Sequence, residues 1–373
     1  MDFPTRAGVL PAQWLRRAID SDVIRSDTYK IPRSNLQPAS LDLRLGETAF
    51  RLRSSFLAGD DDVAARLDDC AMESFDLRDG AILERNRPYL IPLIEELALP
   101  EGLRAKANPK SSTGRLDVFT RVITDRSHRF DEIAEGYSGR LYLEVFSRTF
   151  TIKVRTGLAL NQLRLVSGRA VAPDAAVLDF HRQDPVLFRN GQPVPGEELA
   201  LSDGLFLSLD LRGDDDGFVG YRARKNSRLL DLSAGEPHDP RDFWEPVTRE
   251  RGGRVILEPE EFYLLISSEA VRIPPAFAAE MTAYDPTSGE LRTHYAGFFD
   301  PGFGHDSAGP SRGSRAVLEV RAHDVPFMVE DGQRVCRLVF EEMLEPPEIL
   351  YGRDIGSSYQ GQVVMLSKHF SRS

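Results

Sequence analysis

The feature that most constrains this chain is an internal repeat. Ile82-Leu-Glu84, followed by Tyr89-Leu90, recurs 174 residues later as Ile256-Leu-Glu258, followed by Tyr263-Leu264. Three more matches keep the same order: Ser40-Leu-Asp-Leu-Arg44 with Ser208-Leu-Asp-Leu-Arg212, Leu143-Glu-Val145 with Leu318-Glu-Val320, and Arg164-Leu-Val166 with Arg337-Leu-Val339. Matches that keep the same order from residue 40 to residue 166 of the first repeat predict two homologous domains. Gln192-Pro-Val-Pro-Gly196 has the composition of a linker, so we expect the domains to span residues 1–190 and 191–373.

Each repeat has the pattern of a mainly β domain. Short alternating runs such as 141–146 and 316–320 predict strands, and Gly, Pro, Asn or Asp residues separate many of them. Helical pattern is confined to short pieces such as 11–19. Many short strands with turns between them predict a sandwich, a jelly roll or a barrel in each half. A doubly wound α/β fold is disfavoured, because the strands do not alternate with long helices.

Composition excludes several classes of protein. The 373 residues include 47 basic and 58 acidic side chains, a formal net charge of −11, which argues against a nucleic-acid partner. No apolar run approaches the roughly 20 residues that a membrane-spanning helix needs. The first residues lack the layout of a signal peptide, so we expect a cytoplasmic protein without a membrane partner. Cys70 and Cys336 are too few for a disulfide framework or a multi-cysteine zinc site.

The segment richest in reactive side chains is Lys110-Ser-Ser-Thr-Gly-Arg115, which has two cations, three hydroxyls and a glycine. Glycine lets the backbone approach a ligand closely, and arginine can donate two hydrogen bonds to a phosphate. Loops of this composition are more often plain turns. The loop alone therefore leaves both a phosphate site and a simple turn open.

A second candidate is Glu144, on a predicted strand. Leu143 and Val145 share one face of that strand, so Glu144 shares the other with Tyr142 and Phe146. A carboxylate between two aromatic rings either faces solvent or lies in a desolvated pocket. In such a pocket its pKa would rise toward the range useful for general acid–base catalysis.

Taken together, the motifs resemble those of the dCTP deaminase family, which belongs to the trimeric dUTPase-like superfamily. The resemblance is carried by segments 37–46, 110–115, 128–131, 139–144 and 157–165, and by Tyr351, Ser358-Tyr359 and Gln362 near the C-terminus. The length resembles a long bacterial form in which the domain is duplicated. The resemblance implies two tandem distorted jelly-roll (β-clip) domains with a few short helices, and a nucleotide-covering tail over about 346–373.

The resemblance also implies roles for single residues. Glu144 would be the catalytic general base and acid, and Ser111 and Arg115 would position the water and the pyrimidine. Lys110, Ser112, Thr113 and Gly114 would line the triphosphate path. Asp131 and the backbone near Tyr142 would face the sugar and the base. The tail residues Tyr351, Ser358, Tyr359 and Gln362 would close over the phosphates.

Two departures from the family pattern affect ligand contacts. The segment 131–139 is three residues longer than the family's Asp-Pro-Gly-Trp-Ser-Gly turn, and Ser358 replaces a tail lysine. The second repeat has a degenerate hydroxyl loop over 287–292, and Glu319 stands where Glu144 does. Its short turn around Asp300 has two interpretations, a fixed tight turn or a dUTPase-like residue that orients water. An intact loop in one repeat and a tail after the other suggest one composite site per chain.

The expected reaction converts dCTP to dUTP and ammonia without zinc, because the His-x-Glu and Pro-Cys-x-x-Cys signatures of zinc deaminases are absent. Mg²⁺ would be bound through the substrate triphosphate, and no resident metal site is expected. Two alternatives stay open: a dUTP pyrophosphatase or bifunctional enzyme, and a nucleotide-sensing protein without turnover. The resemblance further implies a trimer of two-domain chains, with dTTP as a candidate inhibitor.

Overall fold

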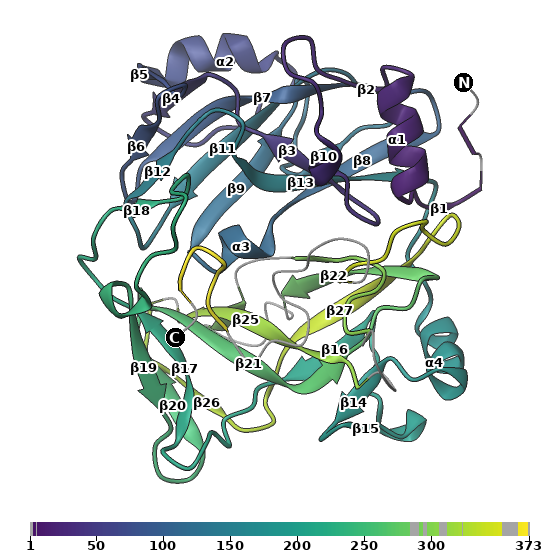
Figure 1. Ribbon diagram of the computed structural model, residues 1–373, viewed down its shortest axis with the longest axis vertical. Helices are drawn as coiled ribbons and strands as arrows, with labels where there is room; N and C mark the ends of the chain where they lie inside the picture. The colour runs from purple at the N-terminus through teal and green to yellow at the C-terminus, as the bar shows by residue number, and fades with distance from the viewer. Residues whose placement is uncertain are drawn as a thin grey trace. The chain divides into compact units, whose positions relative to one another are not determined.

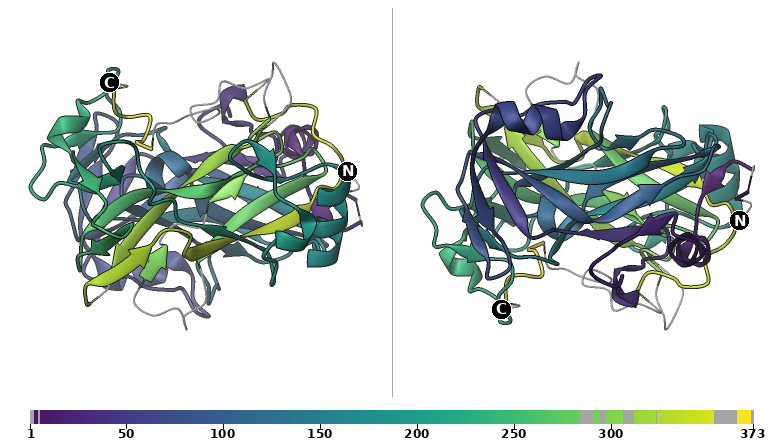
Figure 2. Two further views of the ribbon diagram at one scale, coloured as in Figure 1. Left: turned by 90° about the horizontal axis from the view of Figure 1, so that it is seen from below. Right: turned by 90° about the horizontal axis from the view of Figure 1, so that it is seen from above.

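The chain forms two compact units (Figure 1). The structure, a computed structural model, describes residues 3–4, 6–283, 291–293, 297–305, 312–322, 324–352 and 365–371. The first unit comprises Met1–Ala170, Asn226–Pro237 and Met343–Glu348, and the second comprises Val171–Lys225, His238–Glu342 and Ile349–Ser373. Figure 2 shows from two further sides that strands dominate the fold.

The division between the units precedes the linker expected from the sequence. Helix α4 (Asp174–Gln183) and strand β14 (Leu187–Arg189) belong to the second unit, because Val177 and Leu187 are buried in its core. Gln192–Pro193 forms β15, which pairs with β14 in a hairpin. Asn190 and Gly191, with positive φ, make the turn of this hairpin, and Pro195 precedes the 3-10 turn η2 (Gly196–Glu198), so the segment is structured within the second unit.

The described residues of the first unit form three sheets. The first sheet has, in spatial order, β1 (Gly8–Val9), β13 (Ala159–Ser167), β8 (Leu103–Pro109) and β10 (Glu132–Ile133), with β3 (Leu41–Arg44) also paired to β13. The second has β5 (Ala71–Asp76), β4 (Thr48–Leu52), β7 (Pro88–Ala98), β11 (Ser138–Ser147) and β9 (Val118–Ile123), with β2 (Ile24–Arg25) on β7. The third has β18 (Leu230–Asp231), β12 (Ile152–Val154) and β6 (Ala81–Leu83).

In the residues that the structure describes, the second unit also has three sheets, whose strands follow the order of those in the first unit. The largest contains β15, β14, β21 (Phe262–Val271), β17 (Phe218–Ala223) and β19 (Trp244–Thr248), with β25 (Ser314–Ala322) on β21 and β23 (Leu291–Thr293) on β25. The next contains β16 (Leu205–Ser208), β27 (Arg334–Glu342), β22 (Phe277–Ala283) and β24 (Phe298–Phe299). The last pairs β20 (Arg254–Leu257) with β26 (Phe327–Glu330).

Helices are few and short in the described residues. In the first unit they are α1 (Ala12–Asp20), the 3-10 turn η1 (Arg33–Asn35), α2 (Val63–Cys70) and α3 (Ser111–Gly114). In the second they are α4 and the 3-10 turns η2 (Gly196–Glu198) and η3 (Pro240–Asp242). None of these helices has the length and apolar character that crossing a membrane requires.

Strand registers show which repeat matches are equivalent in space. Val145 lies opposite Tyr89, and Val320 lies opposite Tyr263, so Glu319 takes the register position of Glu144. At the 174-residue offset Lys106 corresponds to Glu280, and Arg164 lies opposite Lys106 whereas Val339 lies opposite Glu280, so the match of Arg164 with Arg337 is displaced by two residues.

The match between Ser40–Arg44 and Ser208–Arg212 is also wrong in register. Leu41 pairs with Leu163, and its spatial counterpart is Leu205, which pairs with Leu338. Glu95 accepts the backbone N–H of Arg44, and Glu269 accepts that of Ser208, which makes Arg44 equivalent to Ser208. Because strand faces repeat every two residues, a four-residue displacement keeps the same apolar face and hides the error in the sequence.

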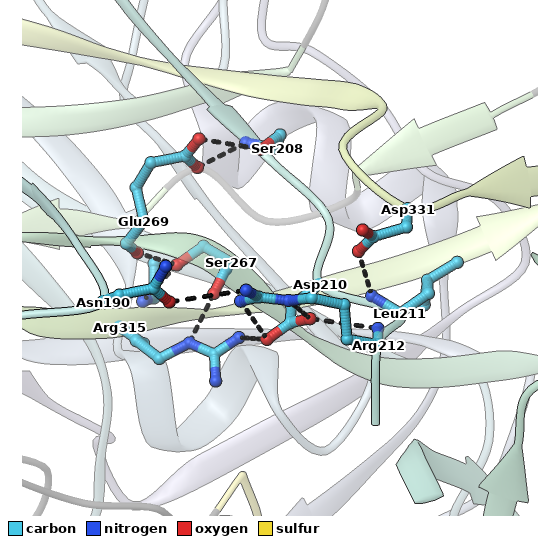
Figure 3. Close-up of polar contacts among 10 residues, drawn as sticks. Asn190, Ser208, Asp210, Leu211, Arg212, Ser267, Glu269, Arg315 and Asp331 are labelled. Carbon is cyan, nitrogen blue, oxygen red and sulfur yellow. Dashed lines mark hydrogen bonds and ion pairs between the residues drawn. The ribbon is translucent and has the colours of Figure 1, made fainter. Parts of the chain in front are cut away.

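The displaced Asp210-Leu-Arg212 segment anchors a bulge in the second unit (Figure 3). Arg212 Nε donates to Asp210 Oδ1 at 3.0 Å, and Arg315 forms an ion pair with Asp210 Oδ2. Arg315 Nε also donates to the backbone carbonyl of Ser267 at 2.6 Å, where β21 leaves its regular pairing with β25. Burial alone would raise the pKa of Asp210, but the hydrogen bonds from Arg212 and the charge of Arg315 hold it below its ordinary value.

Asp210→Asn is expected to destabilise the second unit by about 1 kcal/mol at neutral pH, allowing for the exposure of both arginines. Because the folded-state pKa is lowered, the contribution of the carboxylate is complete above the unfolded-state pKa and is lost as the pH falls through the folded value. Denaturant unfolding of both proteins across acidic pH measures this. Asp215→Asn is the control, since Asp215 is an exposed carboxylate of the same unit. A difference in unfolding free energy between Asp210→Asn and the unmodified protein that does not change with pH would contradict this role of the Asp210 carboxylate.

Candidate active site

Glu144 lies on β11, in the second sheet of the first unit. Strand β11 pairs with β7 and with β9 (Figure 1), and Glu144 lies opposite Leu90 of β7 and opposite Arg121 of β9. Its exposed fraction is 1%. The sequence left two environments open for the Glu144 carboxylate, solvent or a desolvated pocket, and in the structure the carboxylate is buried away from solvent.

Arg121 is the partner of Glu144. Its Nε donates to Glu144 Oε1 at 2.9 Å, and its Nη2 donates to the same oxygen. Glu144 Oε2 is buried and accepts no hydrogen bond from any described residue. The Arg121 guanidinium lies 4.1 Å from the ring centroid of Phe130. No local sequence motif points to Arg121, because its place opposite Glu144 depends on the register between β9 and β11.

The hydroxyl loop folds as one short helical turn, α3, between β8 and β9. The N–H groups of Thr113 and Gly114 donate to the Lys110 carbonyl at 2.8 and 3.0 Å, and Arg115 donates to the Ser111 carbonyl at 3.2 Å. Ser112, Thr113, Gly114 and Arg115 are buried, whereas Lys110 and Ser111 are half-buried. Ser111 is therefore the hydroxyl of this loop with the most access to a ligand.

Lys110 makes an ion pair with Asp42 of β3. Asp42 is buried on the strand that continues the 37–46 motif, so this contact joins two of the segments that carry the family resemblance. The ammonium group expected to line the triphosphate path is therefore already engaged by a carboxylate in this structure.

Asp131 stabilises the loop that follows β9 through two hydrogen bonds. Its Oδ1 accepts the backbone N–H of Val122 at 2.8 Å, and its carbonyl accepts the N–H of Ala107 at 2.8 Å. Its φ of +63° lies in the left-handed region, which aspartate tolerates better than most residues. These contacts give Asp131 a structural function, and the contact with sugar and base stays a prediction.

Tyr142 belongs to an apolar cluster with Leu90 and Ile123. Its exposed fraction is 9%, and burial, followed by the charge of Asp125, raises the pKa of its phenol. The side chain packs in the sheet, which is compatible with the expectation that the backbone, not the ring, faces the base.

A cleft of about 300 Å³ lies beside the loop 124–129 in the first unit. Its lining includes three arginines, Arg104, Arg126 and Arg129, together with His128 and the carboxylates of Asp125 and Glu132. Arginine side chains around a hollow surface can hold an anionic group such as a phosphate.

The second unit places its candidates differently. Glu319 is half-buried, in contrast to Glu144, and Asp300 is buried in its turn. That turn is fixed by its backbone: Gly302 donates to the Ile273 carbonyl at 2.9 Å, and Tyr351 donates to the Pro301 carbonyl at 2.9 Å. The geometry favours the fixed-turn interpretation of this segment.

Several predicted residues lie outside the described residues. Ser358, Tyr359 and Gln362 of the tail belong to this group, as do residues 287–290 of the degenerate hydroxyl loop. Tyr351 is described: it belongs to the second unit, and its ring centroid lies 5.9 Å from that of Phe303. In the described part of the chain, no group of three or more His, Cys, Asp or Glu side chains is arranged to hold a metal ion.

Comparisons with known proteins agree along the whole chain. The N-terminal domain of 2'-deoxycytidine 5'-triphosphate deaminase matches residues 6–169, and the C-terminal domain of the same enzyme matches residues 173–370. The crystal structure of 2'-deoxycytidine 5'-triphosphate deaminase from Agrobacterium tumefaciens superposes with a TM-score of 0.85 and 46% sequence identity, covering 91% of this chain and 100% of that one.

Shorter relatives match part of the chain. The "dCTP deaminase, dUMP-forming" of Methanobrevibacter smithii is 30% identical over 148 residues, which is 39% of this chain and 70% of that protein. The "dCTP deaminase" of Natronomonas pharaonis is 32% identical over 177 residues, which is 46% of this chain and 81% of that protein. The predicted fold class, two tandem dUTPase-like domains rich in strands, is confirmed. The chain therefore belongs to the dCTP deaminase family.

Proposed function

We propose that this chain deaminates dCTP in its first unit, with Glu144 as the general base and acid. The observation that carries the proposal is the buried carboxylate whose Oε1 is held by Arg121 and whose Oε2 accepts no hydrogen bond from a described residue. A buried acceptor of this kind is suited to bind a water molecule. Membership of the dCTP deaminase family supports the same reaction.

In the proposed reaction the amino group at C4 of cytosine is replaced by oxygen. Glu144 takes a proton from water while the water oxygen bonds to C4, and this proton passes to N3. The remaining hydroxyl proton then passes through Glu144 to the amino nitrogen, the C4–N bond breaks, and ammonia leaves. C4 retains a carbonyl oxygen and N3 retains its proton, which gives uracil. A positioned general acid–base contributes about 10²–10⁴-fold, and orientation and fixed donors supply the rest.

Ser111 and Arg115 complete the proposed catalytic set, with Ser111 on the water and Arg115 on the pyrimidine or a phosphate. The half-buried position of Ser111 at the start of α3 supports this assignment. Mg²⁺ enters as part of the substrate, bound to triphosphate oxygens.

We also propose a trimer of two-unit chains, from the resemblance to the trimeric superfamily. Light scattering should give three times the mass of one chain, and the mass of a single chain would exclude the trimer.

We propose dUTP as the product. The Asp131 carboxylate that follows the His128-Arg129 segment is engaged with the backbone of Val122, which argues against its orienting a second water for phosphate cleavage. The second candidate is direct formation of dUMP, and it is favoured by the names of relatives such as the Methanobrevibacter smithii protein.

Product analysis separates the candidates. Purified enzyme is incubated with dCTP and Mg²⁺, nucleotides are separated by chromatography, and ammonia and pyrophosphate are assayed. Equal amounts of ammonia and dUTP are expected. Ammonia with dUMP and pyrophosphate would identify the dUMP-forming reaction, and nucleotide binding without ammonia would identify a nucleotide-sensing protein.

Zinc removal is expected to leave turnover unchanged. The reason is the absence from the sequence of the His-x-Glu and Pro-Cys-x-x-Cys ligands through which zinc deaminases generate hydroxide. The enzyme is treated with a zinc-selective chelator while Mg²⁺ is kept in excess, and its zinc content is measured by mass spectrometry beside its rate. Stoichiometric zinc, with loss of activity on its removal, would contradict the proposed route.

A further inference from the structure

The Arg121–Glu144 pair has an asymmetric geometry. Both donors of Arg121 meet one carboxylate oxygen, Oε1, instead of one donor meeting each oxygen. Arginine commonly binds carboxylates with two parallel hydrogen bonds to both oxygens. The asymmetric arrangement leaves Oε2 as a buried acceptor with no described partner.

Arg121 is itself held in place. Its guanidinium lies 4.1 Å from the ring centroid of Phe130, and its Nη2 donates to Ser55 Oγ at 3.4 Å. Phe130 follows His128 and Arg129 in the loop that lines the cleft. The guanidinium is thus fixed between the sheet and this loop, and it fixes the carboxylate in turn.

We propose that Arg121 is a positioning residue for deamination: it holds Glu144 Oε1 in its buried place and directs Oε2 to the water. This inference rests on the proposed function of Glu144. A buried carboxylate without a cation is costly and tends to take up a proton, in which state it cannot accept one from water. Leu90 on the other neighbouring strand and the flanking Tyr142 and Phe146 carry no positive charge that could replace Arg121.

The test compares Arg121→Gln and Arg121→Lys with the matched control Arg140→Gln. Arg140 lies on β11 and makes a similar ion pair, its Nε donating to Glu96 Oε1 of β7 at 3.0 Å, away from Glu144. In Arg121→Gln, kcat for dCTP is expected to fall about 100-fold while KM changes little. Arg121→Lys is expected to recover part of kcat because it restores the charge, and Arg140→Gln is expected to behave as the unmodified enzyme.

A second comparison separates this inference from the proposed function. In a Glu144→Gln background, Arg121→Gln should cause no further loss, because its effect acts through Glu144. If Glu144→Gln turns over normally, the proposed function of Glu144 fails. If Glu144→Gln is inactive but Arg121→Gln keeps its kcat, or raises KM alone, the positioning role is overturned. Thermal denaturation of each variant checks that the compared proteins are folded. If Arg121→Gln does not fold, the comparison is made with Arg121→Lys.

Discussion

Glu144→Gln is expected to lower kcat for dCTP deamination by at least about 10²-fold and by up to about 10⁴-fold. The amide keeps the size of the side chain and one oxygen acceptor, but it cannot take a proton from water. Arg121 retains a neutral oxygen to bind, so the sheet around β11 should remain folded. Affinity for dCTP is expected to stay nearly unchanged, because the triphosphate is bound by other groups.

Steady-state ammonia release and calorimetric titration with dCTP measure the two quantities separately. The matched control is Glu319→Gln, which alters the glutamate at the same register position of the second unit. Glu319 is half-buried, and the hydroxyl loop of its repeat is degenerate, so this variant is expected to keep the activity of the unmodified enzyme. Full activity of Glu144→Gln, or equal losses in both variants, would contradict a single site in the first unit.

The sequence predicts the strands and the burial of their apolar faces well, because period-two alternation is a local signal. Leu143 and Val145 are buried as their alternation predicts. The same signal cannot distinguish registers that differ by an even number of residues. For that reason the Ser208–Arg212 match is displaced by four residues, and the Asp210 that it aligned with Asp42 is instead engaged with Arg212 and Arg315.

The sequence predicts the parts of the candidate site that lie in a contiguous motif. It misses the parts whose position depends on the pairing between strands. The hydroxyl loop and Glu144 each belong to a short segment with a distinctive composition. Arg121 belongs to no such segment, and its importance follows from lying directly opposite Glu144 on a neighbouring strand. To find Arg121 from the sequence, one would have to infer the pairing of β9 with β11 from the alternation of their apolar residues.

The engagement of Lys110 by Asp42 illustrates the same limit. From the loop alone, Lys110 is a cation free to meet a phosphate, because nothing nearby in sequence opposes its charge. Asp42 is 68 residues away along the chain and reaches Lys110 because β3 and β8 both pair with β13. A nucleotide that uses Lys110 must therefore compete with, or share, an existing ion pair.

Gly46→Ala is expected to destabilise the first unit by about 4 kcal/mol, an effect near the upper end for one substitution. Gly46 follows β3 at the end of the 37–46 motif, and its N–H donates to the Pro92 carbonyl of β7 at 2.9 Å. A Cβ at this position would lie 2.4 Å from that same carbonyl oxygen, closer than any real contact. The clash is with backbone in the middle of a sheet, so no side-chain rotation relieves it, and the hydrogen bond must lengthen or break.

Thermal and denaturant unfolding measure the loss, with Gly235→Ala as the control. Gly235 is exposed, has no positive φ, and an added Cβ there meets no atom within 4 Å, so its replacement is expected to be neutral or slightly stabilising. Because β3 also carries Asp42, the partner of Lys110, a displaced Gly46 should disturb the hydroxyl loop at the other end of that ion pair. Gly46→Ala is thus expected to raise KM for dCTP in whatever fraction remains folded. A variant as stable as the unmodified protein would show that β3 and β7 do not approach as closely as this geometry requires.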